Sequence, residues 1–145
     1  MTKETGTLFE VFEGWETYET SLANAIQLLS SEQLTWKPRP DFRSVGQIAG
    51  HIIQGRLEWF ARMGAPGVQD LIQKAAAYQS IDVISENATE LVEWLETTWG
   101  MIENTLRSWL VSDLETTYLQ EYMGATYAVT RQWTIVRSGV GRACC

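Results

Sequence analysis

Apolar residues recur every three or four positions between residues 91 and 110, and this periodicity constrains the fold more than any other feature. Such spacing predicts an α-helix of roughly five turns with one apolar stripe. A second stripe predicts a helix of about six turns over residues 8–29. The two stripes contain Leu91, Trp94, Leu95, Trp99, Ile102, Leu106, Trp109 and Leu110, and Leu8, Val11, Phe12, Trp15, Tyr18, Leu22, Ala25, Ile26 and Leu29.

Boundary signals predict where two of the helices begin and end. Ser44 and Gln47 form a capping-box pattern, which predicts the start of a helix that continues to about Met63, where the sequence GAPG ends it. We expect Ser85 to cap the helix that contains the stripe over 91–110. Gly100 lies within that helix, and its missing side chain suggests a place where another helix approaches closely.

The remaining segments complete an expected all-α fold. Residues 68–82 fit either a short helix or a linker, and 112–130 are typical of a long loop with an extended piece. A last helix is expected to begin near Thr126 or Thr130, but its periodicity stops after Arg137. With no convincing strand pair, the pattern predicts an up-and-down four-helix bundle with a long crossover and a shortened last helix. We expect one domain over residues 1–137 and an irregular tail over 138–145.

The charge balance excludes two classes of partner. The 145 residues contain 11 Lys and Arg against 18 Asp and Glu, a net charge of −7, and no basic run. Such a chain repels phosphate backbones and anionic membrane surfaces, so we expect neither nucleic acid nor membrane as a partner. No apolar stretch approaches the roughly 20 residues of a bilayer span, and the N-terminus lacks a signal-peptide core. These features predict a cytoplasmic protein.

The sequence lacks the common catalytic motifs for phosphate binding, dinucleotide binding, zinc proteolysis and serine hydrolysis. It contains one histidine, His51, which a helical wheel places just outside the apolar arc of its helix. Two interpretations stay open: a surface histidine, or a metal ligand or acid–base group that lines a polar cleft. Glu58 lies about 10 Å further along the same side, where it is either a solvated charge or an oxygen near such a metal.

Other conspicuous side chains have a packing interpretation. We expect the tryptophans of the helical stripes to lie in the core, and Trp36, in a proline-bounded loop, to plug one end of the bundle. The acids at 90, 93, 96 and 103 are typical of a solvated helix face. Cys144 and Cys145 are either inert or, beside His51, ligands of zinc.

Residues 28–63 resemble the N-terminal half of the DinB/YfiT-like superfamily. The resemblance rests on a tryptophan–proline loop that is followed by a serine–glycine–histidine helix start. It extends with weaker patterns over about residues 7–137, through WLETTWGMIENTLRSWLVSDL and YAVTRQWTIVR. The motif residues are Leu34, Trp36, Pro38, Ser44, Val45, Gly46, Ile48 and His51.

The resemblance implies a four-helix bundle that holds a divalent metal, zinc or nickel, with three histidines. One of them corresponds to His51, and the other two form an HxxxH pair on the fourth helix. Characterised relatives include thiol S-transferases, so the resemblance implies a metal-dependent hydrolase or a transferase that uses a small molecule or a low-molecular-weight thiol. A metal with open coordination positions activates water or a thiol in such enzymes.

The chain departs from this pattern after Arg137, where SGVGRACC stands in place of the HxxxH pair. Three interpretations follow: a frameshift or premature stop, a short paralogue with a binding role, or ligands from another chain. We expect an impaired metal site, because one imidazole does not hold a catalytic metal. The alternative function is a non-catalytic helical binding or dimerisation module. A homodimer would cover the apolar stripe that a short last helix leaves exposed.

Overall fold

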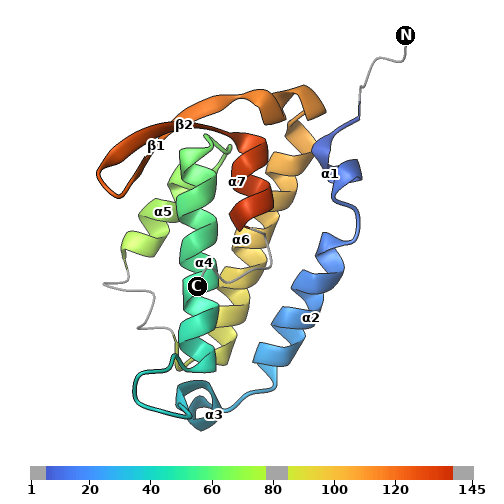
Figure 1. The fold of residues 1–145 in the computed structure, drawn as a ribbon. Helices are drawn as coiled ribbons and strands as arrows, with labels where there is room; N and C mark the ends of the chain where they lie inside the picture. Colours follow the sequence, from blue (N-terminus) through green and yellow to red (C-terminus); the bar gives the residue numbers. More distant parts are fainter. Residues whose placement is uncertain (1–5, 78–84, 139–145) are drawn as a thin grey trace.

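The computed structural model describes residues 6–77 and 85–138, which are mostly helical with one small antiparallel sheet (Figure 1). The predicted helical character is therefore confirmed, whereas the expectation of no strand pair is wrong. The elements are α1 (Leu8–Val11), α2 (Trp15–Gln27), α3 (Ser31–Thr35), α4 (Val45–Arg62), α5 (Val68–Ala76), α6 (Ala88–Ser108), the 3-10 helix η2 (Val111–Glu115), β1 (Thr117–Tyr122), β2 (Ala125–Thr130) and α7 (Arg131–Ser138).

Helix α6 is the centre of the packing, with α2 and α4 along its length (Figure 1). Its apolar stripe is fully buried at Leu91, Leu95 and Ile102, as the periodicity predicts. Asn87, rather than Ser85, caps α6, since its side-chain oxygen accepts a hydrogen bond from the Glu90 amide at 3.1 Å. The close approach expected at Gly100 is also wrong, because a side chain there would meet open space.

The predicted six-turn first helix is interrupted. Helix α1 ends at Val11, and α2 starts after its N-cap, Gly14, which has a positive φ of 98°. Val11 and Tyr18, which belong to the predicted stripe, are exposed. Ser30 does not simply end the helical region: it caps α3 in a capping box with Gln33. Periodicity alone does not reveal either break, because Leu8 of α1, Ile26 of α2 and Leu34 of α3 are buried in the same core.

The segment expected as a long loop contains a β-hairpin. Strands β1 and β2 pair from Thr117 with Thr130 to Tyr122 with Ala125. The turn residues Met123 and Gly124 both have positive φ, as in the tight turns that suit the twist of a hairpin. A Met-Gly turn is a weak signal in a sequence, since Asn-Gly or Asp-Gly marks such turns more often.

The start of the last helix near Thr130 is confirmed. The Thr130 hydroxyl accepts a hydrogen bond from the Trp133 amide at 3.1 Å, and α7 begins at Arg131. The Arg131 side chain then ties this junction to two other helices. Its Nε donates to the Met63 carbonyl at 3.0 Å, and its guanidinium lies 3.9 Å from the centre of the Trp109 ring.

The tryptophans divide between core and surface. Trp94 and Trp109 are buried as predicted, and Trp15, Trp59 and Trp99 are half-buried, whereas 42% of Trp133 is exposed. The expectation that Trp36 plugs the bundle is wrong, because 66% of it is exposed. Leu34, two residues earlier and fully buried, closes this end of the core instead.

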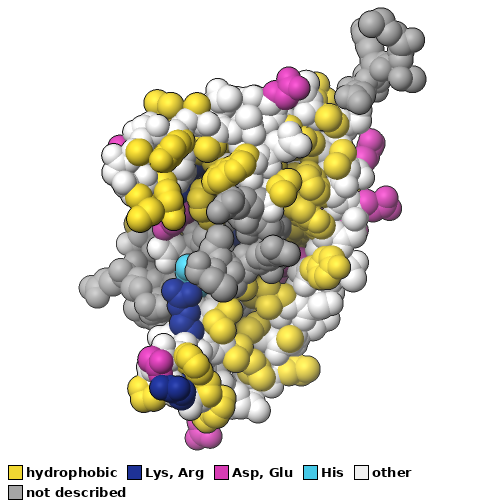
Figure 2. Space-filling model, viewed as in Figure 1, with side chains coloured by type: hydrophobic (Ala, Val, Ile, Leu, Met, Phe, Trp, Pro, Cys, Tyr) yellow, Lys and Arg dark blue, Asp and Glu magenta, His cyan; other side chains and the backbone are white. Residues whose placement is uncertain are grey.

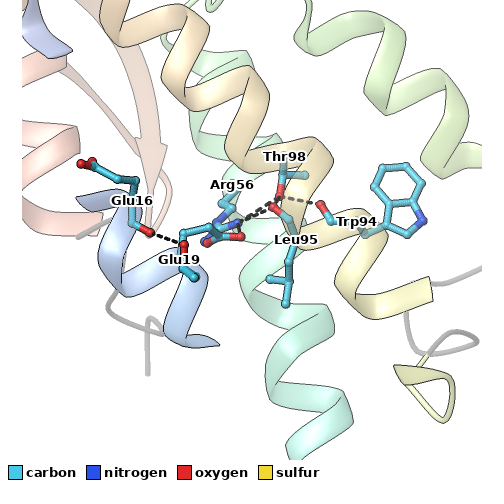
Figure 3. A network of polar contacts seen from close by, with 7 residues as sticks. Glu16, Glu19, Arg56, Trp94, Leu95 and Thr98 are labelled. Carbon is cyan, nitrogen blue, oxygen red and sulfur yellow. Dashed lines mark hydrogen bonds and ion pairs between the residues drawn. The ribbon is translucent and has the colours of Figure 1, made fainter. Parts of the chain in front are cut away.

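A buried ion pair joins α2, α4 and α6 (Figure 3). Arg56 of α4 donates to both carboxylate oxygens of Glu19 of α2, at 2.5 and 3.3 Å. It also donates to the Leu95 carbonyl and the Thr98 hydroxyl of α6, each at 3.1 Å. Both charged side chains are only 6% exposed, so each has lost its contacts with water. The charge-assisted hydrogen bonds between them compensate for that loss.

The structure explains why the family-like motif has a glycine at position 46. It lies in the first turn of α4, where a Cβ atom would collide with the backbone carbonyl of Ser85 and lie 3.1 Å from the Leu34 carbonyl oxygen. Because backbone atoms cannot turn aside as a flexible side chain can, only glycine lets α4 approach the start of α6 this closely.

We predict that Gly46→Ala lowers the free energy of unfolding by about 1–3 kcal/mol, the usual cost of overpacking. The matched control is Gly55→Ala on the same helix, where a Cβ meets no atom within 4 Å. That change should stabilise the protein by about 0.5–1 kcal/mol through the helix propensity of alanine. Urea unfolding of both variants measures the difference, and equal stabilities would contradict the close approach.

We predict that Glu19→Leu lowers the free energy of unfolding by about 3–5 kcal/mol, because it leaves the Arg56 charge buried without its partner. The double variant with Arg56→Met should recover most of this loss, because it removes both charges. As a control, Glu103→Gln breaks an exposed pair with Arg107 and should cost less than about 1 kcal/mol. Denaturant unfolding tests all three, and a double variant as unstable as Glu19→Leu would contradict the prediction.

Candidate functional site

A pocket of about 320 Å³ lies between the loop after α3 and one side of α4. Helix α4 forms one wall, and the loop over residues 37–43 forms the other. Figure 2 shows basic side chains beside the histidine on this face of the molecule. The lining residues are Lys37, Pro40, Asp41, Phe42, Arg43, Gln47, His51 and Gln54.

The helical repeat of α4 places three polar side chains in this wall. Gln47, His51 and Gln54 are spaced by four and three residues, so they share one face of the helix. The capping box fixes the first of them: the Ser44 hydroxyl accepts from the Gln47 amide at 3.2 Å, and the Gln47 side-chain oxygen accepts from the Ser44 amide at 3.0 Å. The side-chain NH₂ of Gln47 is therefore the group that it can offer to a ligand.

His51 is half-buried in the pocket wall, at the boundary between core and solvent where the helical wheel places it. Glu58 is exposed and does not line the pocket. Its carboxylate accepts a hydrogen bond from the Gln54 side chain at 2.8 Å, which leaves the Gln54 carbonyl oxygen for the pocket. The two residues that the wheel puts on one side of α4 thus lie in different surroundings.

The loop wall gives the pocket a positive character. Lys37 and Arg43 line it, and within the parts of the chain that the structure describes neither forms an ion pair. Among the described lining residues the one acid is Asp41, whose carboxylate lies 3.4 Å from the Arg39 guanidinium. Sequence reasoning missed this wall, although WKPRPDFR holds three of the 11 basic residues of an acidic chain.

These surroundings do not fit the three-histidine metal centre that the family resemblance implies. The 145 residues contain one histidine. Over residues 6–77 and 85–138 the structure contains no group of three or more His, Cys, Asp or Glu side chains that could hold a metal ion. The residues that line the pocket with His51 include two cations, which repel a metal ion. Cys144 and Cys145 lie outside the described residues.

Comparison with known protein families identifies the family of this chain. The family model of the DinB superfamily matches residues 15–137, which include α2, the pocket, the hairpin and most of α7. No curated protein and no solved structure matches the chain. Within the described residues, no helix has the length and apolar character to cross a membrane. Because the family model covers most of the sequence, the chain belongs to the DinB superfamily.

Proposed function

We propose that this chain descends from DinB metal-dependent hydrolases or thiol S-transferases and acts as a non-catalytic module that binds a small molecule. One observation carries the proposal. The pocket at His51 is lined by Lys37, Arg43 and the amide of Gln47, which donate hydrogen bonds to a ligand and do not bind a metal. A low-molecular-weight thiol or another small polar molecule is the class of ligand that this pocket suits.

In this proposal α2, α4, α6 and α7 correspond to the up-and-down bundle of the family, within a single domain over residues 1–137. Helix α7, at eight residues, is then the shortened last helix, and the hairpin occupies the long crossover. His51 corresponds to the metal ligand of the ancestor. Since the surrounding residues do not complete a zinc or nickel centre, the proposed binding does not require a metal.

We predict that the purified protein, after dialysis, contains much less than one equivalent of zinc or nickel per chain. One imidazole supplies no chelate, so bound metal should be lost to the dialysis buffer. Mass spectrometry of metal content tests this, with His51→Ala and the pocket control Gln54→Ala alongside. Near-stoichiometric metal that persists in Gln54→Ala and disappears in His51→Ala would overturn the proposal and support a metalloenzyme.

A second candidate function is association with another copy of the chain through the hairpin. Its exposed apolar residues include Leu119 at 75% and Met123 at 88%, with Tyr122 and Tyr127 also exposed. A two-stranded hairpin is marginally stable alone, and no third strand of the described residues pairs with it, so its outer edges offer backbone groups to another strand. A second copy would cover both the edges and the apolar side chains.

We predict that the protein forms dimers as its concentration rises, and that Leu119→Lys combined with Met123→Lys keeps it monomeric. The added charges would have to be buried in the contact. Leu28→Lys is the matched control, because Leu28 is equally exposed, at 85%, but lies at the end of α2. Sedimentation velocity measures the masses; a wild-type monomer at every concentration contradicts this candidate.

A further inference from the structure

We infer that the pocket beside His51 binds a small organic dianion, and that Lys37 and Arg43 hold its two negative groups. This inference rests on the proposed binding function and names the chemical class of the ligand. The two cations are not residues of the family motif. Both lie in the loop between α3 and α4, which forms one wall of the pocket.

The charges of the pocket favour an anion. Lys37 and Arg43 form no ion pair with any described residue, and Arg39 offsets the charge of Asp41. The rest of the chain is acidic, with a net charge of −7 overall. A positive pocket on such a surface attracts a small anion, whereas the surrounding acids repel a long polyanion such as nucleic acid.

The donor groups of the pocket match anionic oxygens. A guanidinium presents paired N–H groups to a carboxylate, and a lysine ammonium adds a second point charge. The Gln47 NH₂ group offers a neutral donor between the loop and His51. The pocket also lies beside the N-terminal turns of the 18-residue helix α4, where the helix dipole favours negative charge.

The size and apolar part of the pocket favour an organic ligand. At about 320 Å³ it holds a molecule of metabolite size and excludes a folded partner. Pro40 and Phe42, which lie between Lys37 and Arg43 in the sequence, also line the pocket. They offer an apolar surface for a short carbon skeleton. Two separate cations with an apolar surface between them suit a dicarboxylate better than a monovalent ion.

The single histidine makes this inference testable at the site itself. Because the chain has one imidazole, its ring protons give one set of histidine signals in a proton NMR spectrum. We expect succinate, titrated at constant pH and ionic strength, to shift these signals saturably with a Kd on the order of 1 mM. Neutral succinamide, with the same skeleton, should leave them unchanged.

Variants identify the groups that bind. Lys37→Gln and Arg43→Gln should each weaken succinate binding by about three- to tenfold, as expected for the loss of one charge-assisted hydrogen bond at a partly exposed site. Lys74→Gln on α5 makes the same change in net charge outside the pocket lining and should leave the Kd unchanged. Thermal unfolding by circular dichroism confirms that each variant is folded before titration.

Three results would overturn the inference: no saturable shift, an equal shift with succinamide, or equal weakening by Lys74→Gln. The titration uses protein that has been dialysed against a chelator and analysed for metal. If stoichiometric metal survives dialysis, the proposed function fails whatever succinate does. If the protein is metal-free and succinate does not bind, only the inference of a dianion ligand fails.

Discussion

The ion pair between Glu19 and Arg56 sets the orientation of α4, on which both the core and the pocket depend. Arg56 reaches inward to α2 and α6, and its charge has no other way to be compensated at 6% exposure. His51 lies five residues earlier, about 140° around the helix. Holding Arg56 in the core therefore holds His51 at the edge between core and solvent. Gly46 acts with it, because its contact with Ser85 presses the same helix against the start of α6.

A second set of contacts closes the other end of α4. Arg131 joins the Met63 carbonyl to the Trp109 ring, and the Tyr118 hydroxyl of the hairpin hydrogen-bonds to the Thr134 hydroxyl of α7. The hairpin is thus fixed at its base by α7 while its tip stays exposed. This arrangement lets the eight-residue helix α7 remain attached to the fold, because the Met63 carbonyl, the Trp109 ring and the Tyr118 hydroxyl hold its first turns.

The sequence predicts the long helices well, but it does not predict the helix break at Gly14 or the hairpin. Helices α4 and α6 follow from periodicity, and the cap at Ser44 follows from its pairing with Gln47. The break at Gly14 depends on one positive φ angle and the hairpin turn on two, and these angles leave the hydrophobic pattern unchanged. The buried ion pair could have been predicted from the sequence, because Glu19 interrupts the first apolar stripe and Arg56 lies among apolar residues of α4. Opposite charges inside two apolar stripes are a reason to expect a buried pair.

The family-like motif says more about the fold than about chemistry. Ser44 caps α4, Gly46 admits the backbone of Ser85, and Leu34 is fully buried, so each of these residues has a role in the fold of this chain. A metal centre needs further ligands that the motif does not include, and the loop wall of this chain supplies Lys37 and Arg43 next to His51. The resemblance implies that the other two ligands belong to the fourth helix, so Lys37 and Arg43 do not replace them but are a separate feature of the loop after α3. The helical scaffold therefore constrains the residues that cap and pack it, while the loop beside it can carry side chains of either charge.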